Sequence, residues 1–281
     1  MFSLEPKISV VIPTWNREKL LEQAIMSALS QSLPVLEILV CDDGSTDQSA
    51  AAVKTIADPR VRWIDGEHSG LPACPRNRGL RNAKGDWIAF LDSDDEWIPD
   101  KIEQQLKLLY AQRRLASCSN AIRFVPLVGR NGRLLQFGKT KITFHELLHG
   151  NPVVASSSLV HKSVVQACGF FSETSRLRGI EDYAYWLRVA TKTDLVYHSE
   201  PLVVYTDDPA KSIRALDSGD GLRQKQLVLR DFLMWAHSRA NAARINPRIL
   251  LLAVAHYLQL DLNRVVGRSL KRLKAISRGP L

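Results

Sequence analysis

Short apolar segments of strand length alternate with stretches of helical periodicity over the first ninety residues, and this alternation limits the fold more than any other feature. The predicted strands lie at residues 8–12, 36–41, 61–64 and 87–91. The predicted helices lie at about residues 20–30, 47–56 and 76–82. This order predicts an α/β fold with a mainly parallel sheet covered by helices, in which ligands bind at the carboxyl ends of the strands.

The later sequence predicts further helices and a region of shorter strands. Amphipathic patterns predict helices over 99–113 and 181–191. Residues 115–160 read as shorter strands joined by turns, such as the one expected at 129–132. Beyond about residue 212 the strand signals end, and the chain becomes helical and basic.

The charge is distributed unevenly along the chain. The net charge is +9, with 45% hydrophobic and 24% charged residues, which is typical of a globular protein. Residues 211–281 hold 14 Lys and Arg against 4 Asp, so residues 1–210 are close to neutral. We therefore predict a main domain over 1–210 and a basic helical extension over 211–281.

The sequence contains no predicted membrane-spanning or export segment. The first residues lack the basic start of a secretory signal, and the longest later apolar stretch, 249–258, is too short to cross a bilayer. The four cysteines are widely spaced and form no CxxC pair, which argues against a disulfide framework or a structural zinc cluster. The predicted location is the cytoplasm.

Acidic residues follow two of the predicted strands directly. One strand runs into Asp92-Ser93-Asp94-Asp95-Glu96, and another into Asp42-Asp43-Gly44-Ser45. Clustered carboxylates favour Mg²⁺ or Mn²⁺, which complete their coordination with water and substrate phosphates. The alternatives are a solvated acidic turn in the first case and an Asp-Gly turn in the second. The position at strand ends favours a functional site.

Taken together, these segments resemble the family 2 glycosyltransferases of the GT-A fold. The matching segments are Ile8–Asn16, Asp42–Asp47, Arg76–Gly79, Phe90–Asp95, Gly169–Glu173 and Glu181–Arg188. The resemblance covers about residues 6–206 and implies a Rossmann-like mixed sheet flanked by helices. It also implies a nucleotide-diphosphate sugar as donor, with a UDP-sugar as the expected one.

The resemblance implies a role for each matching residue. Asp182 is the expected general base, and Asp94 the expected contact to Mg²⁺ or Mn²⁺. The expected nucleotide contacts are Pro13, Thr14, Asn16, Asp43, Arg76, Asp92 and Ser93. One base suffices for direct attack from the opposite face of the sugar, so the expected reaction inverts the anomeric centre. Taken alone, the acids at 181 and 182 would equally suit a helix N-terminus.

The chain departs from the family after its last expected core strand. There the family often has an Arg and a His that assists the metal, whereas this chain has Asp207 and Asp208. Either Asp replaces the ligand, or the third ligand is missing. The Gln- and Trp-containing motif of processive synthases is not evident, so a single sugar addition is expected.

Two other motifs suggest different chemistry. His145-Glu146-Leu147-Leu148-His149 matches the HExxH pattern of zinc peptidases, but the following Gly-Asn-Pro ends the helix and position 155 is Ala. We predict that Leu147 and Leu148 are core residues and that both His are solvated. Gly138-Lys139-Thr140 lacks the first glycine of a P-loop, and no GxGxxG follows the first strand.

The basic extension has two open interpretations. Basic and apolar residues interleave from Arg264 to Arg278, which suits a helix on anionic lipid at the inner face of a membrane, or a solvated helix packed on the catalytic body. Nucleic-acid binding is not expected, because the basic residues are not accompanied by a recognisable DNA- or RNA-binding motif.

The expected function is therefore cell-surface polysaccharide or glycolipid synthesis on a saccharide or lipid-linked acceptor. The alternatives are a catalytically inactive subunit that binds a nucleotide sugar, and the zinc peptidase. The sugar, the acceptor, the linkage and the oligomeric state are not specified by the sequence.

Overall fold

The computed structural model describes residues 5–126, 128–136, 138–208, 221–238, 241 and 245–276, with the backbone alone for 264–276. The chain divides into two compact units, residues 1–216 and 217–281, and each is described by itself. The boundary predicted between residues 210 and 211 falls outside the described residues, and it stays a prediction.

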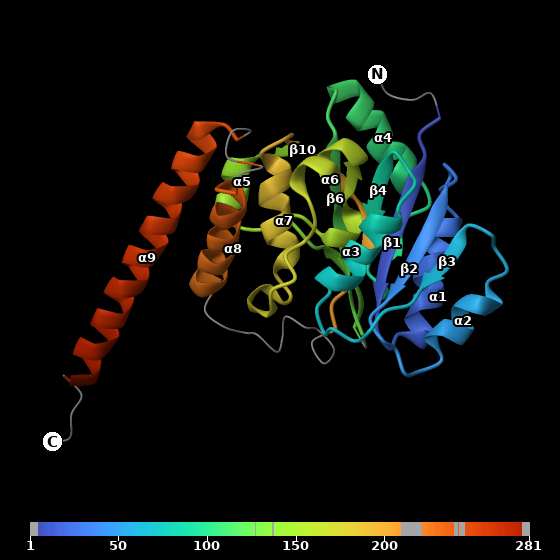
Figure 1. Ribbon diagram of the computed structural model, residues 1–281, viewed down its shortest axis with the longest axis horizontal. Coiled ribbons are helices and arrows are strands. Elements are labelled where there is room, and N and C mark those ends of the chain that lie inside the picture. Colours follow the sequence, from blue (N-terminus) through green and yellow to red (C-terminus); the bar gives the residue numbers. More distant parts are fainter. Residues whose placement is uncertain are drawn as a thin grey trace. The chain divides into compact units, whose positions relative to one another are not determined.

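The first unit is built around one mixed sheet of ten strands within the described residues (Figure 1). Its first half has the order β3-β2-β1-β4, and all these strands are parallel. The strands are β1 (Ile8–Thr14), β2 (Glu37–Asp42), β3 (Val61–Ile64) and β4 (Trp87–Phe90). The connecting helices are α1 (Glu18–Leu29), α2 (Ser49–Thr55) and α3 (Ala73–Asn82). The predicted βαβ pattern is confirmed.

The second half of the sheet makes it mixed, because β9 (Leu159–His161) lies antiparallel between β4 and β6 (Ala116–Val125). Next to β6 lies β10 (Leu195–Thr206), which runs parallel to it. The remaining strands are β5 (Glu96–Trp97) and β8 (Lys141–Ile142), both antiparallel to β10, and β7 (Gly129–Arg133), antiparallel to β6. The mixed, mainly parallel α/β class is as predicted.

Six further α-helices and two 3-10 turns lie in the described part of the chain. The α-helices are α4 (Lys101–Gln112), α5 (Phe144–His149), α6 (Lys162–Cys168), α7 (Glu181–Ala190) and, in the second unit, α8 (Gly221–Ala236), which α9 (Pro247–Ile276) follows. The 3-10 turns are η1 (Ala155–Ser157) and η2 (Ser175–Leu177). Every residue of α7 is buried, so this helix belongs to the core.

The core explains why the first strands consist almost entirely of apolar residues. All residues of β1 and β2 are buried, as expected for parallel strands covered on both faces. Helix α3 packs so closely on β1 that a Cβ atom added at Gly79 would lie 2.3 Å from Cγ1 of Val11. The site therefore rests on a rigid, densely packed layer.

One predicted turn is wrong. Residues 129–132 belong to β7, and the chain reverses just before them, where the Val128 N–H donates to the Val125 carbonyl at 3.1 Å. Gly129 and Gly132 have φ values of 86° and 65°, which glycine adopts easily, and they allow the irregular backbone of this edge strand. The strand before the turn, β6, has ten residues and is longer than predicted.

The second unit consists of α8 and α9, which contact each other. The Gln226 side-chain amide donates to the Asp261 carboxylate at 3.2 Å between the two helices. No helix in the described part of the chain is long and apolar enough to cross a membrane. The side chains of the basic stretch from Arg264 are not described and Arg278 lies outside the described residues, so its membrane contact stays a prediction.

Candidate active site

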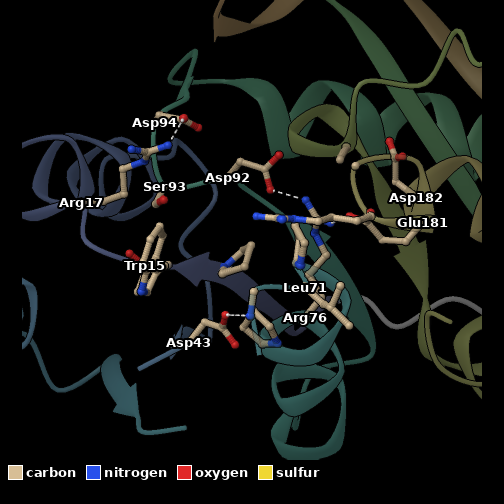
Figure 2. A pocket seen from close by; sticks show the side chains of 18 of the residues that line it. Trp15, Arg17, Asp43, Leu71, Arg76, Asp92, Ser93, Asp94, Glu181 and Asp182 are labelled. Atoms are coloured by element: carbon tan, nitrogen blue, oxygen red, sulfur yellow. Dashed lines mark hydrogen bonds and ion pairs between the residues drawn. The ribbon is translucent and has the colours of Figure 1, made fainter. Parts of the chain in front are cut away.

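The carboxyl ends of β1, β2 and β4 open into a cavity of about 450 Å³, which the start of α7 and the end of β10 also line (Figure 2). The cavity brings together all nine predicted site residues: Pro13, Thr14, Asn16, Asp43, Arg76, Asp92, Ser93, Asp94 and Asp182. Parallel pairing explains part of this convergence, because the register sets Thr14 opposite Asp42 and so aligns two strand ends.

Asn16 ties the first two strand ends together. It has a φ of 50°, in the left-handed region that Asn tolerates better than most residues. Its backbone N–H donates to Ser45 Oγ at 2.9 Å, and its side-chain oxygen accepts from the Thr46 N–H at 2.8 Å. Asn16 therefore fixes the loop after β2 against the loop after β1.

The two acids after β2 have separate tasks. Asp42 closes an Asp-Gly turn, the alternative interpretation of this segment, by accepting hydrogen bonds from the backbone N–H groups of Gly44 and Ser45. Asp43 lines the cavity, and its carboxylate accepts from the Ser69 N–H and hydroxyl and from the Gly70 N–H. Residues 69 and 70 thus fix the carboxylate of Asp43, one of the predicted nucleotide contacts.

Arg76 lies at the centre of the charged groups in Figure 2. Its guanidinium is buried and donates to Asp92 at 2.7 Å and to Glu181 at 2.6 Å. Burial alone would lower the pKa of Arg76, but the negative charges of Asp92, Glu181 and Asp182 outweigh it and raise the pKa. This permanent cation joins the strand end at β4 to the start of α7.

Asp94 and Asp95 follow the same strand but face different surroundings. Asp94 lines the cavity, 3.5 Å from Nη2 of Arg17. Burial, followed by the charge of Asp92, raises the pKa of Asp94. Asp95 instead accepts hydrogen bonds from the Ser156 hydroxyl and the Thr206 N–H, and so holds η1 and β10 in place.

Asp182 stands in the first turn of α7. One carboxylate oxygen accepts from the Asn151 side-chain amide at 3.2 Å, and the other from the Tyr183 N–H at 2.8 Å. The carboxylate forms no salt bridge within the described residues. Its remaining acceptor capacity faces the cavity that Asp182 lines.

Three buried polar atoms on cavity-lining residues lack a hydrogen-bond partner within the described chain. They are the Thr14 hydroxyl oxygen, Nε of Arg76 and Oε2 of Glu181. Buried polar groups are nearly always hydrogen-bonded, so a cluster of such atoms at one cavity suits the binding of a polar ligand.

An aromatic pair that was not predicted from the sequence lies at the cavity. Trp15 is 48% exposed and stacks on His68, with ring centroids 4.7 Å apart. Trp15 follows a predicted nucleotide contact, which is a usable signal, whereas nothing in the sequence around His68 pointed to the site. Arg17 and Arg178 also line the cavity and were also missed.

The structure separates the two candidates for a third metal ligand. Asp207 accepts from Nε of Arg123 at 2.7 Å, whereas Asp208 lines the cavity. Asp208 is therefore the one whose position suits a ligand.

The HExxH segment forms the short helix α5. Glu146 is committed to a capping box with Thr143 and to an ion pair with Lys139. Partial burial alone would raise the pKa of Glu146, but hydrogen bonds from Lys139 and Thr143 lower it to about 2, which makes it a poor base. Leu147 and Leu148 are buried as predicted.

No group of three or more His, Cys, Asp or Glu side chains suited to hold a metal by themselves occurs in the part of the chain that the structure describes.

Comparison with known proteins gives one consistent result. The family model described as "Glycosyl transferase family 2" matches residues 9–168. An uncharacterized glycosyltransferase of Haemophilus influenzae is 36% identical over 184 residues, which cover 65% of this chain and 71% of the relative. The Escherichia coli UDP-Glc:alpha-D-GlcNAc-diphosphoundecaprenol beta-1,3-glucosyltransferase WfgD is 29% identical over 187 residues, which cover 65% of this chain and 69% of the relative.

Solved structures share the fold at low sequence identity. S. aureus TarS in complex with UDP-GlcNAc matches with a TM-score of 0.72 and 20% identity over 94% of this chain and 76% of that chain. A mannosyltransferase of Pyrobaculum calidifontis in complex with GDP-Man and Mn²⁺ matches with a TM-score of 0.58 and 20% identity, over 95% and 81% of the two chains.

Proposed function

The chain belongs to glycosyltransferase family 2, and from this premise we propose that it is an inverting transferase which moves one sugar from a nucleotide-diphosphate donor to an acceptor hydroxyl. The main support for the proposal is that the expected nucleotide contacts, the expected metal contact Asp94 and the expected general base Asp182 all line one cavity. A UDP-sugar is the proposed donor.

The base and ribose of the donor are assigned to the end of the cavity formed by β1 and β2. Oδ1 of Asp43 accepts two hydrogen bonds from Ser69 and Oδ2 accepts one from Gly70, so one lone pair of Oδ2 is left to accept an N–H of the base. The exposed ring of Trp15 offers a face on which a base can stack. Thr14 provides a buried hydroxyl without a partner, which a donor oxygen would satisfy.

The diphosphate is assigned to the acids after β4. Asp92, Asp94 and Asp208 all line the cavity and offer only oxygen ligands, which suits Mg²⁺ or Mn²⁺ completed by the phosphates of the donor. Burial, and then the charge of Asp92, raise the pKa of Asp94, and a bound cation would offset both effects. When bound, the ion would act as a Lewis acid that stabilises the negative charge of the leaving diphosphate.

Asp182 is the proposed catalytic base. In the reaction the acceptor hydroxyl oxygen attacks the anomeric carbon while the bond from that carbon to the phosphate oxygen breaks, and the nucleoside diphosphate leaves. The hydroxyl proton passes to Asp182. Asn151 and the Tyr183 N–H orient the carboxylate for this transfer. Attack on the face opposite the leaving group inverts the anomeric configuration.

The proposed acceptor is a saccharide or a lipid-linked saccharide of cell-surface polysaccharide or glycolipid synthesis. The name of the E. coli relative WfgD specifies a sugar on diphosphoundecaprenol as its acceptor, which supports this class. The proposed compartment is the reducing cytoplasm, since the four cysteines are free thiols.

The test is calorimetric titration of UDP, GDP, CDP and ADP, each with and without Mn²⁺, into the wild type and Asp94→Ala. We expect one nucleotide to bind tightly with Mn²⁺, and the variant to lose most of the gain that Mn²⁺ brings. If none of the four nucleotides binds, the proposed donor site is wrong. Binding of one nucleotide with no transfer to any acceptor would favour an inactive, donor-binding partner subunit.

A further inference from the structure

The positive charges of the cavity are almost all paired. Arg17 lies beside Asp94, and Arg76 bonds to both Asp92 and Glu181. Arg178 also lines the cavity and is exposed, yet its side chain makes no salt bridge or hydrogen bond within the described residues. It is therefore the cavity-lining arginine that remains available to an anionic ligand.

Local structure holds Arg178 at the mouth of the cavity. It follows η2, whose Leu177 is 1% exposed and anchors the turn in the core. The Arg178 N–H donates to the Ser175 carbonyl, and the Ile180 N–H donates to the Leu177 carbonyl at 2.9 Å. Gly179, with a φ of 77°, then turns the chain into α7. The arginine is thus presented by a hydrogen-bonded turn.

The same turn leads directly to the proposed base. Arg178 precedes Asp182 by four residues, so their Cα atoms lie at most about 14 Å apart. The proposed function assigns the phosphate groups of the donor to Asp92 and Asp94, which follow β4. An anion held by Arg178 therefore belongs on the acceptor side of the cavity.

We infer that Arg178 binds a phosphate of the acceptor, and that this phosphate is attached to the same sugar whose hydroxyl reacts. The inference rests on the proposed function and names the acceptor class, a glycosyl phosphate or diphosphate. The limit of about 14 Å between the Cα atoms of Arg178 and Asp182 allows one sugar ring to lie between the phosphate and the reacting hydroxyl. A guanidinium holds a phosphate with two charge-assisted hydrogen bonds, which a lysine cannot reproduce.

The experiment compares two probes that differ only in phosphate. One is N-acetylglucosamine joined through a diphosphate to an octyl chain, and the other is the octyl glycoside of the same sugar. Each is titrated calorimetrically into the full chain saturated with UDP and Mn²⁺, so that the donor site is already filled. The proteins are wild type, Arg178→Ala, Arg178→Lys and the control Arg176→Ala. Arg176 is exposed on the same turn and does not line the cavity.

We expect the wild type and Arg176→Ala to bind the diphosphate probe at least about tenfold more tightly than the glycoside. Arg178→Ala should bind the diphosphate probe about 10- to 100-fold more weakly, with Arg178→Lys in between and glycoside binding unchanged. Circular dichroism and UDP affinity should match the wild type in both variants.

Two results would overturn the assignment. Equal binding of both probes by the wild type would exclude an acceptor-phosphate subsite. A loss of UDP affinity in Arg178→Ala would place the arginine on the donor side instead. If UDP fails to bind the wild type, the proposed function fails separately, and the comparison of probes on nucleotide-free protein still decides the role of Arg178.

Discussion

Nη1 of Arg76 lies 2.6 Å from Oε1 of Glu181, and both side chains are buried. The contact joins α3 to α7 through two residues that lie 105 positions apart in the sequence. Because the other end of the guanidinium bonds to Asp92, one side chain sets the position of the acids after β4 relative to the start of α7.

Arg76→Ala should lower the free energy of unfolding by about 3–5 kcal/mol, since it leaves Glu181 buried and unpaired. The double variant Arg76→Met with Glu181→Gln should lose less unfolding free energy than the single variants Arg76→Met and Glu181→Gln lose together. Urea unfolding followed by circular dichroism measures both. Glu103→Gln, which breaks an exposed pair with Lys107, is the control and should leave the free energy of unfolding almost unchanged. Additive losses at Arg76 and Glu181 would contradict the coupling.

Asp182→Asn should reduce the rate of sugar transfer by about 10²- to 10⁴-fold and leave nucleotide affinity unchanged, because the amide cannot accept the proton. Product formation under saturating donor, together with calorimetry, separates the two effects. Asp58→Asn is a suitable control, since that carboxylate binds Arg60 and does not line the cavity. Wild-type turnover in Asp182→Asn would show that another group is the base.

Trp15→Ala should weaken UDP binding by about 10- to 100-fold if the base stacks on the indole ring. Trp15→Phe should retain most of the affinity, and Met26→Ala, at an exposed site on α1 outside the cavity lining, all of it. UDP should also change the indole fluorescence of the wild type. Unchanged affinity in Trp15→Ala would mean that the exposed pair with His68 serves another purpose.

Lys101 should make stability depend on pH. Its ammonium group is fully buried, bonded to Gln105 at 2.8 Å and placed over the Trp97 ring, and burial lowers its pKa to about 7. Between this value and the ordinary pKa of 10.5 the unfolded chain binds more protons than the folded one, so the contribution of Lys101 to stability rises with pH.

The measurement compares Lys101→Met with the wild type by urea unfolding at pH 7 to 9. As the pH rises, the free energy of unfolding of the wild type should increase relative to that of the variant by up to about 1.4 kcal/mol per pH unit. Lys107→Met, at an exposed position of the same helix, should show no such gain. Parallel pH profiles for wild type and Lys101→Met would disprove the ionisation.

Gly79→Ala should destabilise the first unit by about 1–3 kcal/mol, because its new methyl group would overlap the Val11 side chain. Gly150→Ala is the matched control: its φ of 170° is extended backbone, and nothing lies near its added Cβ. Thermal unfolding of both variants is sufficient. Unchanged stability of Gly79→Ala would mean that β1 and α3 can move apart without a loss of stability.

Site residues could be predicted from the sequence where they directly follow a predicted strand. Asp43, Asp92 and Asp94 directly follow apolar strands, and parallel pairing alone brings such ends to one edge of a sheet. Local patterns also located the strands and helices of the first half.

Contacts between distant segments could not be predicted. Nothing near His68 shows that it will stack on Trp15, and no periodicity reveals that β9 inserts between β4 and β6. The turn expected at 129–132 failed because glycine also occupies irregular edge strands. Arg178 has no motif of its own, and only the shape of the cavity singles it out.

The position of β9 has a consequence for how the molecule assembles. Strands β1 to β4 pair through short βαβ units, so they can form while the chain is still being made. One edge of β4 stays open until β9 arrives, far later in the sequence. During that interval the nascent sheet exposes an apolar, unpaired edge, which is a site for aggregation. We expect hydrogen exchange during refolding to protect β1 and β2 before β9.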